Sequence, residues 1–348
     1  MPNNTPALKG YSMPPEWEIH EATWISWPHP DCLSFPGTYE KVLPVFVQMA
    51  AAIAESEILR INVADASEEA RVRPLLAKLP PDRVEYFHIP TDEPWCRDHG
   101  SIFVKRPAAP KLAALDFGFN AWGWKLSSFE EDDDAARLMA EAVKVPVFSK
   151  KDFILEGGSI DVNGAGSVLT TESCLLNANR NPDRSREQIE NILRACLGVS
   201  KVLWLGDGIE GDDTDGHVDD IARFVNAHTV VAAVEENERD PNYEPLQLNL
   251  ERLRGMTLAD GSPLHVRTLP MPPKIVRNGQ RLPASYANFY ITNASVLMPS
   301  YNDPNDAWAE SVLKELFPAR RIVPIDCREL IWGLGAFHCL TQQQPAVA

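Results

Sequence analysis

The most informative segment of this 348-residue chain is Gly335-Ala336-Phe337-His338-Cys339-Leu340-Thr341-Gln342-Gln343-Gln344-Pro345. It places Cys339 between a glycine-containing loop and a run of amide side chains. A cysteine acts as a nucleophile when thiolate character, a proton shuttle and groups that orient an electrophile converge on its sulfur. Cys339 is therefore a candidate nucleophile, provided that the rest of the chain supplies such partners.

Three other segments place acidic and imidazole groups beside glycine. They are Trp95-Cys96-Arg97-Asp98-His99-Gly100, Glu156-Gly157-Gly158-Ser159 and Asp215-Gly216-His217-Val218-Asp219. Glycine commonly marks tight turns, where the backbone comes close to a ligand. We therefore take four side chains of these segments as candidate partners of the cysteine: Asp98, Glu156, His217 and Asp219.

The spacing of these candidates indicates a repeat. Asp98 and Glu156 are 58 positions apart, and Glu156 and His217 are 61 apart. His217 and Cys339 are 122 positions apart, which is twice 61. A unit of about 60 residues, repeated around a common centre, would bring one residue from each unit to one site, and repeats of this length are typical of propellers and arrays.

Helix and strand patterns alternate along the chain. Apolar residues recur at helical spacing in residues 39–56 and 185–197. A third helix is predicted at 304–316, opened by Asp303 as its cap and closed before Pro318. Short runs of β-forming residues predict strands at 58–64, 84–89, 102–104, 112–117, 167–171, 228–234, 295–298 and 321–325. The acidic run 130–134 indicates a solvated loop or the start of a helix. This alternation, without an obvious linker, predicts an α/β fold, which we assign to a single domain over residues 1–348.

Composition and charge exclude several classes of protein. Hydrophobic residues make up 44% and charged residues 24%, which is typical of a globular protein rather than a disordered or membrane protein. No segment approaches the roughly 18 to 20 apolar residues that cross a bilayer. The net charge of -16 opposes binding to nucleic acid or anionic lipid and favours cationic ligands. Many acidic proteins carry such a charge for solubility alone, so this preference does not identify a ligand.

The N-terminus and the cysteines indicate a compartment. Residues 1–6 lack the basic and apolar regions of a secretory signal. The six cysteines include no C-x-x-C pair, which argues against a zinc ribbon or a dense disulfide framework. We therefore expect a cytoplasmic protein whose cysteines are thiols.

Six segments together carry a resemblance to a known family. They are Trp95-Cys96-Arg97-Asp98, Phe119-Asn120-Ala121-Trp122-Gly123, Glu156-Gly157-Gly158-Ser159, Thr171-Glu172-Ser173-Cys174-Leu175-Leu176-Asn177, Gly216-His217-Val218-Asp219 and His338-Cys339-Leu340-Thr341-Gln342-Gln343-Gln344-Pro345. In these segments the chain closely resembles agmatine deiminases, within the guanidine-modifying superfamily that includes bacterial peptidylarginine deiminases and arginine deiminases. The match runs in order from about Met13 to Pro345, and its specificity lies in the combination of segments.

The resemblance implies a fold, a set of roles and an assembly. The implied fold is a five-bladed α/β propeller of ββαβ units around a pseudo-fivefold axis, which agrees with the spacing. The implied enzyme uses neither a metal nor an organic cofactor and is a homo-oligomer. By position, the family's nucleophile is Cys339, its general acid/base is His217, the carboxylate that orients the histidine is Glu156, and the guanidinium-binding carboxylates are Asp98 and Asp219.

The chemistry of a guanidinium group fits these roles. Two carboxylates would hold its N–H groups by charge-assisted hydrogen bonds and align its carbon with the sulfur. As that carbon becomes tetrahedral, positive charge localises on the nitrogens, so this stabilisation grows toward the transition state. Cys339 would attack, and His217 would protonate the departing ammonia and then activate water against the thiouronium. Glu156 would keep His217 protonated, because an opposite charge raises a histidine pKa.

We expect hydrolysis of agmatine to N-carbamoylputrescine and ammonia, a reaction of polyamine (putrescine) biosynthesis. A deiminase of arginine, free or at a peptide terminus, is the alternative. An amidinotransferase would need an acceptor site that the sequence does not reveal, and a module that only binds guanidines would need neither Cys339 nor His217. A metal site is a further alternative, because His217 and Asp219 are two residues apart and would lie on one face of a strand. The absence of H-x-H and H-E-x-x-H motifs from the chain argues against such a site.

Agmatine and arginine share the guanidinium group but differ at the other end of the molecule, so the residues that bind that end must differ between an agmatine-specific and an arginine-specific enzyme. Agmatine requires an acceptor for its ammonium and an apolar sleeve for its methylenes, whereas arginine requires a cation for its carboxylate. The segments Asp92-Glu93-Pro94-Trp95 and Asp212-Asp213-Thr214-Asp215 are acidic and aromatic. We expect Trp95 to form the sleeve and Asp213 to bind the ammonium. Arg97 is the only cation near either segment, and it would be the carboxylate anchor of an arginine-specific enzyme.

Two departures from the resemblance concern specificity. Many agmatine deiminases read G-G-G-N-x-H-C before the nucleophile, whereas this chain has Leu334 and Ala336 in that loop. Trp124 stands where many relatives carry glycine in N-A-W-G-G. We expect these changes to alter the pocket without altering the deiminase chemistry.

Overall fold

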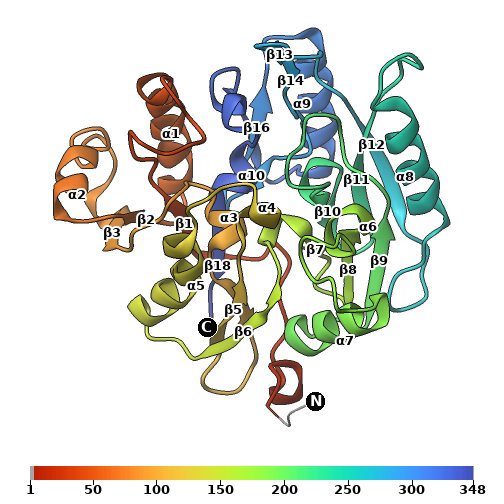
Figure 1. Ribbon diagram of the computed structural model, residues 1–348, viewed down its shortest axis with the longest axis horizontal. Coiled ribbons are helices and arrows are strands. Elements are labelled where there is room, and N and C mark those ends of the chain that lie inside the picture. The colour runs from red at the N-terminus through yellow and green to blue at the C-terminus, as the bar shows by residue number, and fades with distance from the viewer. Residues whose placement is uncertain (1–3, 348) are drawn as a thin grey trace.

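The computed structural model describes residues 4–347 and contains six small sheets, none of them closed (Figure 1). The α/β class that the sequence predicts is therefore confirmed. The long helices lie toward the periphery of the view, whereas the short helices α3 (Cys96–His99), α4 (Ala121–Trp124) and α10 (Phe337–Leu340) lie near its middle. Within the described residues, no helix has the length and apolar character that a membrane crossing requires.

Five of the sheets share one pattern of strand pairing, and in four of them the three strands follow one another along the chain. In one of them, β4 (Ile102–Lys105) pairs antiparallel with β5 (Leu112–Gly118), and β6 (Val147–Ile154) then pairs parallel with β5. A parallel neighbour requires a crossover connection, which α5 (Glu130–Ala142) provides. The acidic run 130–134 is thus the start of a helix, as the sequence allowed.

Three more sheets repeat this connection with helices α7 (Arg186–Leu197), α8 (Tyr243–Gly255) and α9 (Pro304–Leu316) as the crossovers. In each of these sheets the first two strands are antiparallel and the third is parallel to the second. The first sheet consists of β7 (Asp161–Val162), β8 (Ser167–Thr171) and β9 (Lys201–Leu205), and the second of β10 (Ala222–Asn226), β11 (Thr229–Val234) and β12 (His265–Pro270). The third consists of β15 (Tyr290–Ile291), β16 (Ser295–Ser300) and β17 (Arg321–Asp326). A two-stranded ribbon of β13 (Val276–Arg277) and β14 (Gln280–Arg281) stands apart from them.

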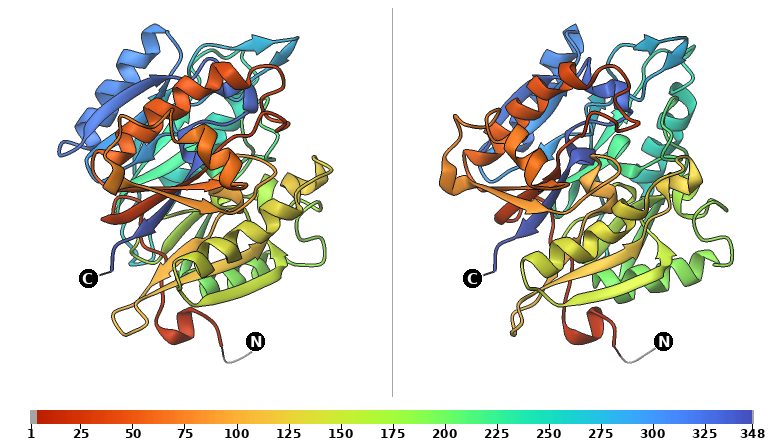
Figure 2. Two further views of the ribbon diagram at one scale, coloured as in Figure 1. Left: turned by 90° about the vertical axis from the view of Figure 1, so that its left-hand side faces the viewer. Right: turned by 60° about the vertical axis from the view of Figure 1, so that its left-hand side comes forward.

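The remaining sheet joins the two ends of the chain. β1 (His20–Ser26) pairs parallel with β2 (Ile58–Val63) across α1 (Tyr39–Ala54), and β3 (Val84–His88) extends this sheet beyond α2 (Ala66–Val72). β18 (Thr341–Pro345) supplies the antiparallel partner of β1, and Figure 2 shows the two strands side by side. The segment quoted at the outset therefore completes a sheet with residues from the other end of the chain.

Local signals explain where the long helices begin and end. α7 opens on a capping box in which the Ser185 side chain and Gln188 satisfy each other's backbone N–H groups, and it closes on Gly198 at a φ of 69°. α9 opens on the cap Asp303, followed by Pro304 in its first turn. The three predicted helices are confirmed, as are the eight predicted strands, each to within about two residues at either end.

Candidate active site

Four short helical turns carry the candidate residues, and each turn directly precedes the first strand of a sheet. α3, with Asp98, precedes β4, and α10, with Cys339, precedes β18. The 3-10 turn η3 (Gly157–Ser159) follows Glu156 and precedes β7, and η4 (Val218–Asp220), with Asp219, precedes β10. α3 contacts both α10 and η3, and η3 contacts η4, so the repeat brings these residues to one place.

Cys339 lies at this meeting point and is 4% exposed. Its Sγ lies 3.6 Å from Asp219 Oδ2 and accepts a hydrogen bond from Asn288 Nδ2 at 3.1 Å. Burial and the neighbouring carboxylates of Asp219 and Asp220 raise the pKa of the thiol well above its usual range. These neighbours therefore favour the neutral thiol over the thiolate.

The carboxylate of Asp98 is held in a fixed orientation. Its Oδ1 accepts from the Gly158 backbone N–H at 3.0 Å, and its Oδ2 accepts from Trp122 Nε1 at 2.9 Å. Burial raises its pKa to about 6, an effect that His217 opposes. A Cβ at Gly158 would stand 2.6 Å from His217 Nδ1 and 2.8 Å from Asp98 Oδ1, so only glycine permits this approach.

Asp219 is anchored through a chain of buried charges. Its Oδ2 lies 2.6 Å from His338 Nδ1, and the other ring nitrogen of His338 lies 2.8 Å from Glu16 Oε2. Glu16 in turn accepts from Arg223 at 2.7 Å. Burial alone would raise the pKa of Asp219, but the hydrogen bond with His338 holds it below its usual value. Asp219 therefore presents a negative charge beside the sulfur.

His217 and Glu156 have polar atoms without partners. Neither ring nitrogen of His217 nor Oε2 of Glu156 has a hydrogen-bond partner within residues 4–347, although both side chains are fully buried. Burial opposes protonation of His217, but the charge of Asp98, 3.6 Å from Nδ1, raises its pKa well above the usual value. His217 and Glu156 do not line the cavity described below, but the ring of His217 lies beside the Asp98 carboxylate, which does.

The donor atoms of Glu156, Cys174 and His217 lie within 4.8 Å of one another and are the one group in the described chain that could hold a metal ion. However, the guanidinium of Arg180 already donates to Glu156 Oε1 at 2.5 Å. A cation bound to this trio would have to share the carboxylate with a fixed positive charge, which disfavours it. The arrangement therefore fits a histidine beside a carboxylate better than a metal centre.

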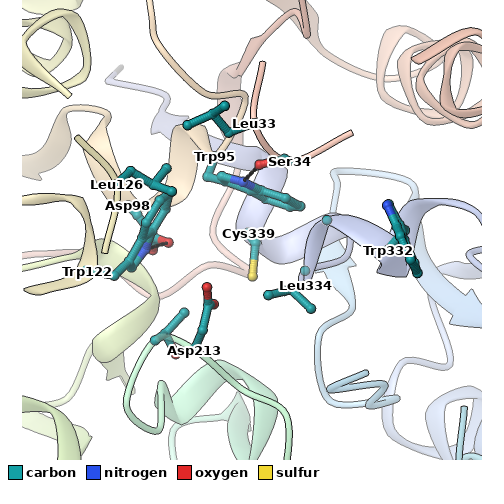
Figure 3. Close-up of a pocket in the computed structure, with 13 residues that line it drawn as sticks. Leu33, Ser34, Trp95, Asp98, Trp122, Leu126, Asp213, Trp332, Leu334 and Cys339 are labelled. Carbon is teal, nitrogen blue, oxygen red and sulfur yellow. Dashed lines mark hydrogen bonds between the residues drawn. The ribbon is translucent and has the colours of Figure 1, made fainter. Parts of the chain in front are cut away.

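A cavity of about 120 Å³ opens onto the sulfur (Figure 3). It is lined by Leu33, Ser34, Trp95, Asp98, Trp122, Leu126, Asp213, Thr214, Trp332, Gly333, Leu334, Gly335 and Cys339. No lysine or arginine of the described chain belongs to this lining. The cavity therefore offers carboxylates and apolar surface to a ligand.

Trp95 forms one wall of the cavity. Its Nε1 donates to Ser34 Oγ at 2.8 Å, which fixes the plane of the indole. A Cβ at Gly335 would stand 2.6 Å from this ring, and one at Gly333 would stand 2.9 Å from it. The glycines before the cysteine therefore let the indole pack against the backbone that leads to Cys339.

Asp213 lies on the opposite side of the sulfur from Trp95 in Figure 3, with its carboxylate directed toward Cys339. Burial and the neighbouring Asp212 raise its pKa to about 6. Arg97, in contrast, faces away from the cavity. It is buried against β18, donating to the His338 carbonyl at 3.2 Å and to Gln343 Oε1 at 2.7 Å, so it is not placed to anchor a carboxylate in the cavity.

Known deiminases resemble this chain over nearly its whole length. A model of the Porphyromonas-type peptidyl-arginine deiminase family matches residues 12–345. The chain belongs to this family. Its relatives within the deiminases include the agmatine deiminase of Ectopseudomonas mendocina strain ymp, 37% identical over 98% of this chain and 97% of the relative. The agmatine deiminase of Pseudomonas aeruginosa strain LESB58 is 38% identical over 99% of this chain and 98% of the relative.

A solved deiminase structure is similar over nearly the whole chain. The agmatine deiminase of Enterococcus faecalis, described as catalysing its reaction, superposes with a TM-score of 0.92 at 35% identity and covers 99% of this chain and 98% of its own. The resemblance that the sequence motifs indicated is therefore confirmed at the level of the whole fold.

The two departures from other deiminases take different places in this structure. Leu334 lines the cavity at a φ of 70°, a conformation that glycine and asparagine adopt more readily than leucine. Ala336, in the same loop, is buried. Trp124 has a φ of 68° but is 67% exposed, packs edge-on against Phe129 and is not part of the cavity lining. Only the loop of Leu334 therefore reaches the pocket.

Several residues of the site escaped the sequence analysis. Trp122, which orients Asp98, lay within a quoted segment but received no role. Arg180 links Glu156 to Asp215 and to the Thr214 carbonyl, yet it stands in a segment without a motif. Asn288 contacts the sulfur from the repeat unit to which the spacing assigned no candidate. That gap, the 122 positions between His217 and Cys339, was the available signal for Asn288.

Proposed function

We propose that this protein is an agmatine deiminase, which hydrolyses agmatine to N-carbamoylputrescine and ammonia within putrescine biosynthesis. The observation that carries this proposal is the cavity onto which Cys339 Sγ and the Asp98 carboxylate open, with no cation among its described lining residues. Agmatine carries a positive charge at both ends, and such a cavity attracts it. Similarity to agmatine deiminases over nearly the whole chain supports the same substrate.

In this proposal Asp98 and Asp219 bind the guanidinium. Asp219 Oδ1 is buried and has no partner within residues 4–347, so it is available to an N–H group of the substrate. Asp98 already receives two protein hydrogen bonds, which fix its carboxylate while each oxygen retains a further lone pair. Two preorganised carboxylates hold a planar cation with its carbon facing the sulfur.

The bound cation also prepares the nucleophile. The carboxylates around Cys339 favour the thiol, and a guanidinium placed among them reverses that balance because its positive charge stabilises the thiolate. The thiol releases its proton to solvent, and the thiolate forms a bond to the guanidinium carbon. The carbon becomes tetrahedral as the π electron pair of one C–N bond moves onto its nitrogen.

His217 carries protons in both halves of the cycle. Its raised pKa supplies the proton that converts the departing nitrogen to ammonia as the C–N bond breaks, leaving an amidino group on Cys339. The neutral ring then accepts a proton from water, whose oxygen attacks the same carbon. The C–S bond breaks, the remaining hydroxyl proton passes to the sulfur, and the ureido product leaves with Cys339 restored as a thiol. The carboxylate of Glu156 stabilises the protonated form of His217, and Arg180 orients that carboxylate by a hydrogen bond.

The far end of the substrate is read by the rest of the cavity. We assign the methylene sleeve to Trp95 and the ammonium contact to Asp213, on the opposite side of the sulfur. The burial of Arg97 against β18 removes the cation that an arginine carboxylate would require. This assignment favours agmatine over arginine.

We also propose the architecture and setting of this enzyme. The five sheets with one shared pattern of strand pairing, and the pairing of β18 with β1, support a five-bladed propeller of ββαβ units in one domain over residues 1–348. The cytoplasm, where six unpaired cysteines would stay reduced, is the compartment that we expect. A homo-oligomer that needs neither metal nor organic cofactor remains our prediction.

The test is turnover by the purified protein. Agmatine and arginine are supplied in parallel, and ammonia and ureido product are measured, with Cys339→Ser as the matched variant. We expect agmatine to be the better substrate by kcat/KM, and the serine variant to lose activity by on the order of a thousandfold or more, because serine is a far weaker nucleophile without a strong base. Mass spectrometry of quenched wild type should find an amidino group on Cys339 alone. A kcat/KM for arginine equal to that for agmatine would refute the substrate assignment.

A further inference from the structure

Arg180 is a buried cation between the carboxylate of Glu156 and the loop that carries Asp213. Its side chain is 0% exposed, and it lies in the segment between α6 (Glu172–Leu175) and α7. Burial disfavours its charge, but the carboxylate of Glu156 opposes this effect and raises the pKa of Arg180 above its usual range. A charge that is buried at such a cost requires partners, and it restrains them in turn.

The guanidinium of Arg180 joins two parts of the site. Its Nε donates to Glu156 Oε1 at 2.5 Å. Its Nη1 donates to Asp215 Oδ2 at 2.6 Å, and its Nη2 donates to the Thr214 carbonyl at 3.0 Å. Thr214 and Asp215 directly follow Asp213 along the chain. Because a guanidinium is planar and its N–H groups form a rigid fork, it holds these partners at one separation.

Two neighbouring elements bear on this arrangement. Lys125 Nζ lies 2.9 Å from Asp215 Oδ1 and donates to the Asp213 carbonyl, but its side chain is 30% exposed, so solvent weakens its hold on the loop. From α4, a Cβ at Gly123 would stand 2.8 Å from Arg180 Nη1, so this turn packs directly against the guanidinium. Arg180 is therefore a buried support of the loop, and it has little room to move.

The separation between the two ends of the cavity follows from these contacts. Glu156 stabilises the protonated form of His217, whose Nδ1 lies 3.6 Å from Asp98 at the guanidinium end. Asp213 is the proposed ammonium contact at the other end. A guanidine with a terminal ammonium engages both ends only when its methylene chain matches their separation. A residue that fixes this separation therefore decides which chain length is accepted.

We propose that Arg180 is a positioning residue that sets the length of substrate the cavity accepts, because it ties the carboxylate beside the acid–base histidine to the loop that binds the far ammonium. The inference rests on the proposed function and adds a selectivity to it. Agmatine is preferred over guanidines that carry the same two charges on a chain one methylene shorter or longer. Arg180 acts through Glu156 and Asp213 and touches no reacting atom itself.

Two variants separate this role from simple support of the fold. Arg180→Lys keeps the buried charge but replaces the rigid fork by one flexible ammonium, so the two parts of the site are no longer held at one separation. Asp215→Asn weakens the hold on the loop and leaves the contact with Glu156 in place, which keeps the proposal testable if Arg180→Lys does not fold. The matched control is Arg184→Lys, whose arginine bonds to Asp152 and lies outside the cavity lining.

The measurement is steady-state turnover of agmatine, 3-aminopropylguanidine and 5-aminopentylguanidine, with thermal unfolding as a check on the fold. We expect wild type to prefer agmatine by about 10-fold or more in kcat/KM, because the other two cannot engage both ends of the cavity. Arg180→Lys should reduce this preference to within about threefold and lower kcat for agmatine by about 10- to 100-fold, because Glu156 loses its orientation. Asp215→Asn should reduce the preference mainly through KM, with kcat within about threefold. Arg184→Lys should change neither.

The outcomes distinguish this inference from the proposed function. A chain-length preference in Arg180→Lys and Asp215→Asn equal to that of wild type would overturn the role of Arg180, whatever their stability. If wild type turned over all three amines equally well, the length selectivity would fail, whereas turnover of agmatine would leave the proposed function intact. Arginine, supplied in parallel, tests the proposed substrate separately. Equal kcat/KM for arginine and agmatine would refute that substrate, while the chain-length profiles would still decide the role of Arg180.

Discussion

The floor of the cavity and its mouth are built on different principles. At the floor, Asp98 and Cys339 line the cavity and Asp219 lies behind them, 3.6 Å from the sulfur; all three are buried, and each is fixed by hydrogen bonds to other buried side chains. At the mouth, Leu126, Asp213 and Leu334 line the cavity from partly exposed loop positions. The floor is thus held by the turns of the repeat, whereas the mouth is formed by loops. Substitutions should therefore cost catalysis at the floor and alter selectivity at the mouth.

The largest effect is expected for the two aspartates of the floor. Asp98→Asn and Asp219→Asn keep the shape of the side chain but remove the charge that faces the guanidinium. Each should lower kcat/KM for agmatine by about 30- to 1000-fold, which corresponds to about 2 to 4 kcal/mol of transition-state stabilisation. Steady-state kinetics check this expectation. Rates within a fewfold of wild type in both variants would mean that the floor lies elsewhere.

The floor also predicts a pH dependence. Asp98 must be ionised to bind the cation, and its pKa is raised to about 6. The carboxylate is therefore lost as pH falls through about 6, so kcat/KM for agmatine should decline below this pH. The decline should persist in Asp213→Asn, although Asp213 also has a pKa near 6. If it vanished in that variant, the mouth rather than the floor would control acid inactivation.

At the mouth, Asp213→Asn should affect binding more than chemistry. Loss of one ionic contact to the ammonium should raise KM for agmatine by about 5- to 30-fold, with kcat within about twofold. The preference for agmatine over arginine should narrow. Asp134→Asn, which removes the same charge from the outer surface of α5, is the control for long-range attraction and should leave KM unchanged. A fall in kcat alone would place Asp213 among the floor residues.

The smallest effect is expected at two residues that share a backbone conformation but not a location. Leu334→Gly and Trp124→Gly both relieve a positive φ, which offsets lost packing and should keep the change in unfolding free energy within about 1 kcal/mol. Only Leu334→Gly should shift KM for agmatine, by a fewfold, because only Leu334 lines the cavity. Equal shifts in KM in the two variants would contradict the assignment of Leu334 to the mouth and of Trp124 to the outer surface.

The sequence predicted the elements whose signals are local. α7 and α9 carry caps and an apolar face, so their bounds could be read directly. β18 could not, because its Thr-Gln-Gln-Gln-Pro sequence lacks the apolar alternation of a strand and is buried through its amides instead. Gln342 donates to the Ser101 carbonyl, and Gln344 accepts from Trp24. Polar burial of this kind depends on partners far along the chain and leaves no periodic trace.

The candidate site shows the same division. Cys339, His217 and Asp219 could be proposed from the sequence because thiol, imidazole and carboxylate groups are reactive by their residue type alone. The resemblance to deiminases then assigned a role to each. The contact of Asn288 with the sulfur depends on which atoms face it after folding, and an asparagine in an aromatic run indicates nothing by itself. Arg97 illustrates the converse. Its position beside Asp98 suggested a cavity residue, whereas the helical turn directs its side chain to the opposite side.

The pairing of β18 with β1 has a consequence for how the protein comes into being. Trp24 and Gln344, which bond across this sheet, are 320 positions apart, so β1 waits for almost the entire chain before it acquires its antiparallel neighbour. During synthesis the ribosome delivers the carboxylates and the histidine well before the sulfur. A nascent chain that has emerged only as far as residue 330 carries Asp98, His217 and Asp219 but lacks both Cys339 and His338, which holds Asp219. The strand that closes the first sheet therefore arrives together with the proposed nucleophile and with the residue that anchors a guanidinium-binding carboxylate.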